Sequence, residues 1–182
     1  KVRLLLAAVL ALSACKKEPN KDSVPSEPPK AKSLTVGLVT DVGGRGDQSF
    51  NDSALRGLEL WAANQKSVDG KYVALPAEER KASLPPELES RISPLGIKPI
   101  VVQSKAQEDY QPNLQLLVDQ GADLTVGTGF MLENAVETVA KQNPQSRFLL
   151  IDSPVLDAKG APLSLPNVRT VVFKEEEGSF LV

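Results

Sequence analysis

The sequence predicts an α/β fold in which helices cover both faces of an open, parallel β-sheet. Short apolar runs rich in β-branched residues alternate along the chain with segments whose apolar residues recur every three or four positions. Proline or glycine marks several of the boundaries between these segments. Strands and helices that alternate in this way form parallel strands joined by right-handed crossovers.

The N-terminal segment is expected to lie outside this fold. Lys1 and Arg3 precede an apolar run from Leu4 to Leu12, which is too short to cross a bilayer and has the features of a signal peptide. Two small residues connect this run to Cys15, the only cysteine, as in a bacterial lipoprotein signal. We expect residues 1–14 to be removed and Cys15 to be acylated. An ordinary secretory signal with an incidental cysteine is the alternative.

The lipid on Cys15 predicts where the protein works. Two or three acyl chains give a stable anchor, so we expect a lipid-anchored protein of the cell membrane that faces the periplasm or the cell exterior. Residues 15–33 are rich in Lys, Glu, Ser and Pro and contain almost no large apolar side chain. Such a segment cannot offset its chain entropy by burial, so we expect a flexible linker between lipid and domain.

The composition argues against several kinds of site. The net charge is −2 and the basic residues form no stripe, so nucleic acid is not an expected partner. The chain has no histidine, and its one cysteine is assigned to the lipid. We therefore expect no disulfide, no metal site and no cofactor, and the lack of a histidine base weighs against an enzyme.

The first predicted elements are a strand, a loop and a helix. Leu34–Thr40 is an apolar run that suits a strand buried on both faces. Asp41–Gln48 is a glycine-rich loop, and the Ser-x-x-Asp spacing from Ser49 to Asp52 predicts a capping box before a helix. The apolar face of this helix consists of Ala54, Leu55, Leu58, Trp61 and Ala62.

The segment Ser67–Gly96 breaks the alternation. It carries several charges and the prolines Pro76, Pro85, Pro86 and Pro94. We expect a surface insertion that has room for one short helix.

The alternation then resumes as far as the end of the sequence. Strands are predicted at Pro99–Gln103, Leu124–Gly127, Phe148–Ile151 and Val168–Phe173. Pro112 suits the first turn of one helix and Gly121 its C-terminal cap. The next helix ends before Pro144, and its apolar face consists of Leu132, Ala135, Val136, Val139 and Ala140.

The residues that follow each strand are the candidate site, because ligands in open α/β sheets bind beyond the carboxyl ends of the strands. Asp41 follows the first strand, Gly129 the third, and Asp152 and Ser153 the fourth. Carboxylates there suit a neutral polyol or amide-bearing ligand, and the ring of Phe50 offers a flat face for a base. The same edge is expected to hold Ser104, Phe130, Lys174 and Glu175.

Each candidate also has a purely structural explanation. Asp41 could close an Asx turn, Phe50 could form a hydrophobic staple, and Asn51 could cap the helix. Asp152 could satisfy backbone donors at a strand end, and Gly129 could serve only a tight turn. The sequence leaves these alternatives open.

Two further patterns do not indicate a cofactor or a metal. The Gly44-x-Gly46 loop has Ser49 where a dinucleotide-binding fingerprint needs its third glycine, and no Gly-Lys-Ser/Thr follows as in a phosphate-binding loop. Glu175–Glu177 diverge at the start of a helix, where they suit the helix dipole.

The segments Val39–Asp41 and Asp47–Asn51 together resemble the opening motif of the basic membrane protein family. The members of this family are bacterial substrate-binding lipoproteins of ABC transporters. The likeness covers Leu34–Val182 apart from the insertion, and its first and last motifs are the specific ones. The further segments that resemble the family, in its order, are Glu108–Tyr110, Pro112–Leu114, Val126–Phe130, Phe148–Asp152, Pro166–Val168 and Phe173–Phe180.

The resemblance implies a type I periplasmic-binding-protein-like fold, in which two α/β lobes close on a ligand. Residues 34–182 would then be an incomplete N-terminal lobe, with the second lobe missing from this sequence. Characterised members of the family bind purine nucleosides, and Asp41, Phe50, Asn51 and Asp152 match ligand contacts of the family, so the resemblance implies that they contact the ligand. Phe50 would stack on the purine, and the polar residues would bond base edges or ribose hydroxyls. Gly129 and Ser153 are additional candidates.

The resemblance also implies partners: the permease subunits of an ABC importer, reached by a monomer that carries its solute. Gly44 and Gly46 replace more usual acidic or polar residues of the family, and the insertion is unusual, so either could alter ligand choice. A sugar or another small polar solute is the alternative ligand. A lipoprotein sensor or adhesin without transport is the alternative function, and an enzyme ranks last.

Overall fold

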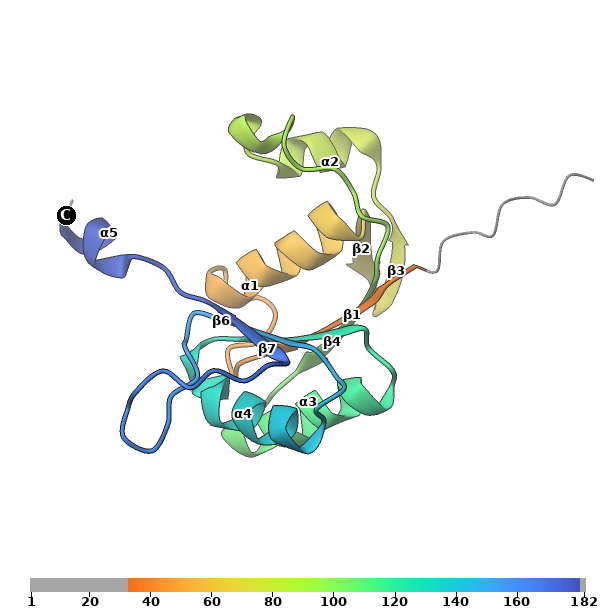
Figure 1. The fold of residues 1–182 in the computed structure, drawn as a ribbon. Helices are drawn as coiled ribbons and strands as arrows, with labels where there is room; N and C mark the ends of the chain where they lie inside the picture. The colour runs from red at the N-terminus through yellow and green to blue at the C-terminus, as the bar shows by residue number, and fades with distance from the viewer. Residues whose placement is uncertain (1–32, 181–182) are drawn as a thin grey trace, which may run out of the picture. The chain divides into compact units, whose positions relative to one another are not determined.

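The computed structural model describes residues 33–180, and within them five parallel strands form one sheet in the order β4-β1-β5-β6-β7 (Figure 1). The predicted α/β fold with an open parallel sheet is confirmed. Because β1 lies between β4 and β5, the residues that follow it stand near the middle of the carboxyl edge. The strands are β1 Thr35–Thr40, β4 Lys98–Gln103, β5 Leu124–Thr128, β6 Phe148–Ile151 and β7 Val168–Val171.

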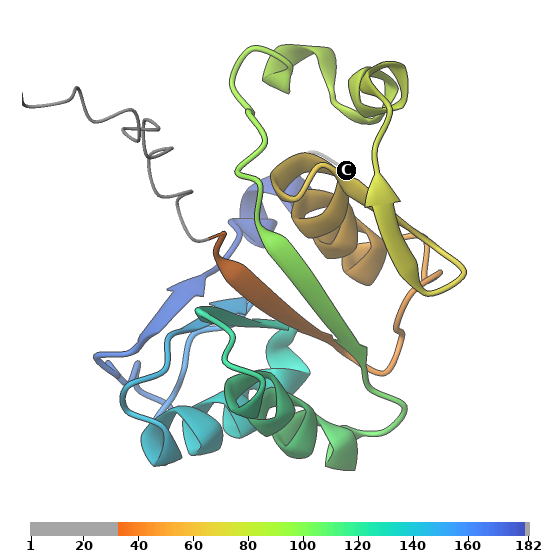
Figure 2. The same ribbon diagram turned by 90° about the vertical axis from the view of Figure 1, so that its right-hand side faces the viewer.

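Helices cover both faces of the sheet, as predicted (Figures 1 and 2). On one face, α1 (Phe50–Leu55) continues into the π-helical segment η1 (Arg56–Ala62). On the other face lie α3 (Tyr110–Asp119) and α4 (Glu133–Gln142). The short elements next to them are the 3-10 turns η3 (Gln107–Asp109) and η4 (Phe130–Leu132), and the helix α5 (Glu175–Phe180) after β7.

Successive residues of β1 divide the core between the two faces. Leu38, 2% exposed, packs with Leu55 of α1, whereas Val39, fully buried, packs with Leu114 of α3. A strand that is covered on both sides needs apolar residues at consecutive positions. This is why the first strand is a continuous apolar run instead of an alternating one.

The observed boundaries follow the predicted ones closely, with one exception. α3 has Pro112 in its first turn, and Gly121 follows its end with a left-handed φ of 74°. The last strand was predicted to reach Phe173, but β7 ends at Val171. Phe173 therefore lies in the segment that connects β7 with α5.

The insertion contains more regular structure than we predicted. β2 (Gln65–Val68) and β3 (Lys71–Ala74) form an antiparallel hairpin, which is followed by α2 (Ala77–Ser83) and the turn η2 (Pro86–Leu88). Asp69 and Gly70 occupy the hairpin turn, both with positive φ, which is the backbone of a type I′ turn. The Asp-Gly pair was the sequence signal for this hairpin.

Among the described residues, no helix is both long and apolar enough to cross a bilayer. The predicted signal peptide, Cys15 and the linker as far as Lys32 lie outside the described residues.

Candidate functional site

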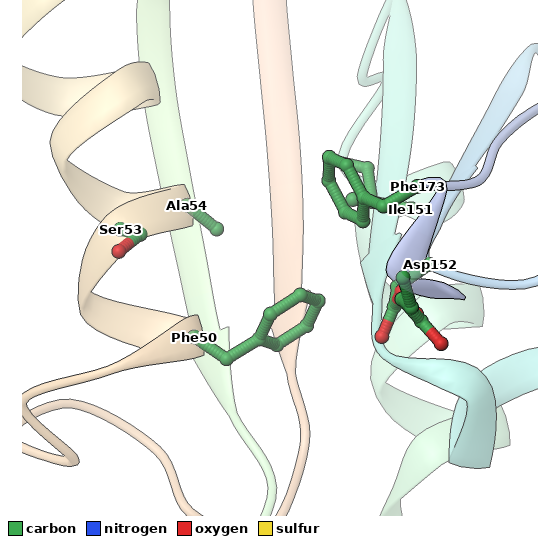
Figure 3. A pocket seen from close by; sticks show the side chains of 7 residues that line it. Phe50, Ser53, Ala54, Ile151, Asp152 and Phe173 are labelled. Carbon is green, nitrogen blue, oxygen red and sulfur yellow. The ribbon is translucent and has the colours of Figure 1, made fainter. Parts of the chain in front are cut away.

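A pocket of about 540 Å³ opens between α1 and the carboxyl ends of β6 and β7. Figure 3 shows that helix α1 contributes one side of it, with Phe50, and that the segments after β6 and β7 contribute the other, with Asp152 and Phe173. The structure thus places two predicted site residues, Phe50 and Asp152, around one cavity. The full lining consists of Phe50, Ser53, Ala54, Ile151, Asp152, Phe173 and Glu175.

The second aromatic side chain of this pocket was not among the predicted site residues. Phe130 follows β5 at the predicted edge of the sheet, but its side chain is 67% exposed and does not line the pocket. Phe173 lines it instead, because β7 ends two residues earlier and the chain then turns toward α1. Two sequence signals mark this position: Phe173 ends an apolar run directly before a charged segment, and it begins the family-like segment Phe173–Phe180.

Asp41 and Asn51 form a reciprocal pair at the end of β1. The Nδ2 group of Asn51 donates to Oδ1 of Asp41 at 2.6 Å, and the backbone N–H of Asp41 donates to Oδ1 of Asn51 at 3.2 Å. The backbone N–H of Gly43 also donates to Oδ1 of Asp41, at 2.8 Å, which is the Asx turn that the sequence allowed. These bonds fix Oδ1 of Asp41, whereas its Oδ2 takes no part in them.

Asn51 is only 1% exposed, and its amide is occupied by the protein itself. Its Nδ2 group also donates to Asp47 at 3.0 Å, and the hydroxyl of Thr128 lies 3.5 Å from its Oδ1. Both donor hydrogens and the acceptor of the amide are thus used internally. In this structure Asn51 orients Asp41.

Gly129 lies between Asp41 and Phe50. An ideal Cβ placed on Gly129 would be 3.6 Å from Oδ2 of Asp41 and 3.6 Å from Cε1 of Phe50. Its φ of 101° is open to glycine and strained for other residues. Gly129 therefore connects the Asp41 pair with the pocket, so that the three residues share one edge of the sheet.

The helix that carries Phe50 is capped by a residue other than the one predicted. Asp47, not Ser49, accepts the backbone N–H groups of the first turn: Oδ1 from Ser49 at 2.9 Å and Oδ2 from Asn51 at 2.8 Å. Asp52 reaches back to the N–H groups of Gly46 and Gln48. The predicted Ser49–Asp52 box is therefore wrong in its first member, because the glycine-rich loop folds back far enough to bring Asp47 over the helix start.

This capping affects the pKa of Asp47. Desolvation raises the pKa, but the hydrogen bonds from the backbone N–H groups of Ser49, Asn51 and Asp52 outweigh it, so the pKa lies below its usual range. The carboxylate consequently stays charged at the positive end of the helix.

Asp152 and Glu175 bring two carboxyl groups together in the pocket. Asp152 has a left-handed φ of 72°, and its backbone N–H donates to the carbonyl of Val171 at 2.7 Å. A hydrogen bond with Asp152 and the negative charge of Asp152 raise the pKa of Glu175. One wall of the pocket is therefore acidic and accepts hydrogen bonds.

Ser153 faces away from these groups. It is 4% exposed, and its hydroxyl lies 3.1 Å from Oε2 of Glu133, at the start of α4. The other carboxylate oxygen of Glu133 accepts the N–H of Leu156 at 2.8 Å. Ser153 and Glu133 together hold the loop that follows β6.

The arrangement suits a flat ligand that donates hydrogen bonds. Two aromatic rings offer stacking faces, and carboxylate oxygens accept N–H or O–H donors. Within the described part of the chain, no three His, Cys, Asp or Glu side chains gather into a possible metal site.

Comparisons with known proteins identify the family. A family model described as "ABC transporter substrate-binding protein PnrA-like" matches residues 34–182. A CD4+ T-cell-stimulating antigen of Listeria innocua is 30% identical over 182 positions, which cover 98% of this chain and 41% of that protein. The ABC transporter nucleoside-binding protein BmpA of Lactococcus lactis is 28% identical over 178 positions, which cover 98% of this chain and 40% of that protein.

A solved structure supports the same relationship. The chain superposes on an ABC transporter solute-binding protein from Aeropyrum pernix K1 with a TM-score of 0.52 and 26% identity, over 79% of this chain and 30% of that one. The chain spans 41% and 40% of the length of the two curated relatives named above.

Proposed function

Because the chain belongs to the Bmp family of PnrA-like ABC transporter substrate-binding proteins, we propose that it supplies one lobe of a lipoprotein that binds a purine nucleoside and delivers it to an ABC permease. The observation that carries this proposal is the pocket in which Phe50 and Phe173 stand with the carboxyl groups of Asp152 and Glu175. A purine has a flat face for the rings and N–H donors for the acidic wall. The relative from Lactococcus lactis is named a nucleoside-binding protein, which supports the same ligand class.

In the proposed complex, the ring of Phe50 stacks on the base, an interaction that contributes about 1–3 kcal/mol. Asp152 and Asp41 accept hydrogen bonds from the base edge or the ribose hydroxyls, each of which adds about 1 kcal/mol net. Gly129 leaves the space between Asp41 and Phe50 free of a side chain. Asn51 and Ser153 act through their neighbours, by orienting Asp41 and by holding the loop that carries Asp152.

The remaining contacts come, in this proposal, from a second lobe that closes over the pocket by a hinge motion and excludes water. Acylated Cys15 anchors the protein to the membrane, with the binding lobes outside the cytoplasm. The protein acts as a monomer that docks on the permease subunits and performs no chemistry on its ligand.

Calorimetry on the full-length protein tests the ligand. Inosine, guanosine and adenosine should release heat with a defined stoichiometry, whereas ribose alone should bind far more weakly. If a folded full-length protein binds none of the three nucleosides, the nucleoside proposal is wrong. If ribose and a nucleoside compete with similar affinity, the ligand is a sugar.

A further inference from the structure

A buried carboxylate stands in the middle of helix α1–η1. Glu59 is 3% exposed, and both of its carboxylate oxygens are occupied. Nη1 and Nη2 of Arg45 donate to Oε2 and Oε1 at 3.0 Å and 2.6 Å, a two-pronged ion pair. The hydroxyl of Tyr72 donates to Oε1 at 2.7 Å. A charge at such depth costs free energy unless it is paired in this way.

The two residues that donate to Glu59 belong to different parts of the chain. Arg45 lies in the glycine-rich loop Asp41–Gln48, between the candidate ligand residues Asp41 and Phe50. Tyr72 lies on β3, in the hairpin of the insertion. Figure 2 shows this hairpin lying along the helix α1–η1, to which Glu59 belongs. Glu59 is therefore the point at which the insertion and the binding loop meet.

The insertion is held to the same helix at a second point. Nη1 of Arg80, on α2, donates to the backbone carbonyls of Leu60 and Trp61 at 2.6 Å and 2.9 Å. These carbonyls lie at the end of η1, where helical partners run out. Two separate contacts thus hold the hairpin and α2 against the helix, and they fix the position of the Tyr72 hydroxyl.

Arg45 is also fixed through its backbone. Its N–H donates to Oε1 of Gln103, the last residue of β4, at 2.8 Å. The middle of the loop is thereby attached to the sheet on one side and, through its guanidinium group, to the helix and the insertion on the other.

The protonation states keep this cluster intact. The hydrogen bond to Glu59 raises the pKa of Arg45, although desolvation lowers it. Burial and the bond to Glu59 raise the pKa of Tyr72 well above its usual range. Both groups therefore remain donors throughout the pH range in which proteins are handled.

We propose that the insertion serves as a brace for the binding loop: Tyr72 and Glu59 are positioning residues that hold Arg45, and with it the loop Asp41–Gln48, in the conformation that presents Asp41 and Phe50 to the ligand. This inference rests on the proposed function for its consequence in binding. Its structural part, the order of the loop, is independent of any ligand.

Hydrogen exchange of the full-length protein without ligand tests the structural part. Tyr72→Phe removes one donor and Glu59→Gln removes the charge that pairs with Arg45. We expect the amides of residues 43–48 to exchange about fivefold faster in Y72F, the change expected from one lost hydrogen bond, and faster still in E59Q. The amides of α3 and α4, on the other face of the sheet, should exchange as in the wild type. Lys66→Ala is the matched control, because Lys66 lies on the same hairpin and pairs only at the surface with Glu79.

The outcomes separate this inference from the proposed function. If loop exchange in Y72F and E59Q equals that of the wild type, or if all regions accelerate together, there is no brace. Where the wild type binds inosine, the Kd in Y72F should rise about threefold to tenfold with K66A unchanged, and an unchanged Kd in Y72F would refute the positioning role. A wild type that binds no nucleoside refutes the proposed function alone, since the exchange data still decide on the brace.

Discussion

At the scale of single residues, the site depends on side chains whose hydrogen bonds are already committed to other groups. Asn51 and Asp47 are both polar residues near the carboxyl edge of the sheet, yet the polar groups of their side chains form hydrogen bonds within the protein. The groups left to face the pocket are the ring of Phe50 and the carboxyl groups of Asp152 and Glu175.

The first prediction at this scale concerns stacking. Phe50→Leu in the full-length protein should raise the Kd for inosine about tenfold, because a stacked base is worth about 1–3 kcal/mol and leucine retains only part of the contact. Calorimetry measures the change. Phe130→Leu is the matched control, since this ring is 67% exposed and lies outside the pocket. Equal losses in both variants would show that the ring of Phe50 has no special role.

The second prediction at this scale concerns the cap of α1 and its dependence on pH. Because the pKa of Asp47 is lowered in the folded protein, its charge stabilises the fold above the unfolded pKa of about 3.9, and this stabilisation disappears as the pH falls through the folded value. Asp47→Asn keeps an oxygen acceptor but removes the charge at the helix start, so it should cost about 0.3–1 kcal/mol of unfolding free energy at pH 7. The difference should shrink below pH 4, where the protonated Asp47 resembles asparagine.

Urea unfolding at several pH values measures this difference. Ser49→Ala is the control, because the structure assigns the cap to Asp47, and this variant should remain within about 0.5 kcal/mol of the wild type at every pH. A larger loss in S49A than in D47N would restore the capping box that the sequence predicted.

At the scale of the elements, the close packing of β1 against α3 depends on a missing side chain. An ideal Cβ on Gly37 would lie 2.7 Å from both Cδ1 and Cδ2 of Leu117, which is fully buried. Gly37→Ala should therefore lower the unfolding free energy by about 1–3 kcal/mol, the cost of forcing extra volume into a packed core. Thermal or urea unfolding measures the loss.

Gly57 provides the control on the opposite face of the sheet. A Cβ there would meet no described atom within 4 Å, and the residue lies within the helical segment η1. Gly57→Ala should leave stability unchanged or raise it by up to about 1 kcal/mol, because alanine favours helix more than glycine does. If both variants lose the same free energy, the contact with Leu117 is not the cause.

The regular structure of the insertion was only partly predictable from the sequence. Its prolines and charges correctly predicted a surface segment, but the hairpin was missed because its strands are short and mostly exposed. Such strands have no buried face, so the alternation that normally reveals a strand is absent. The Asp69-Gly70 turn was the remaining signal.

At the scale of the whole molecule, one face of the sheet is only partly covered. Beside α1–η1, an apolar groove of about 580 Å³ exposes side chains of β1, β5 and β6, among them Val36, Leu124 and Leu149. Apolar surface of this kind usually marks a contact with another part of a protein or with a partner.

This leads to a prediction for residues 33–182 expressed alone. They should bind a hydrophobic dye such as ANS with a clear rise in fluorescence. They should bind inosine far more weakly than the full-length protein, because in the proposed two-lobe mechanism these residues supply only half of the contacts. Fluorescence and calorimetry on both proteins measure this. Micromolar binding of inosine by residues 33–182 alone would contradict the two-lobe mechanism.

The sequence by itself determined the alternation of strands and helices outside the insertion, the parallel sheet and the edge at which Asp41, Phe50 and Asp152 lie. These features follow from local periodicity and from the handedness of crossovers, which every residue in an element helps to specify. The tertiary structure alone decided that Asn51 and Ser153 turn toward the protein, that Phe173 and not Phe130 lines the pocket, and that Asp47 caps α1. It also decided that Tyr72 reaches Glu59. Each of these depends on a single side chain and on the partner that packing brings to it. Such a contact between distant residues does not appear in the periodicity of the sequence.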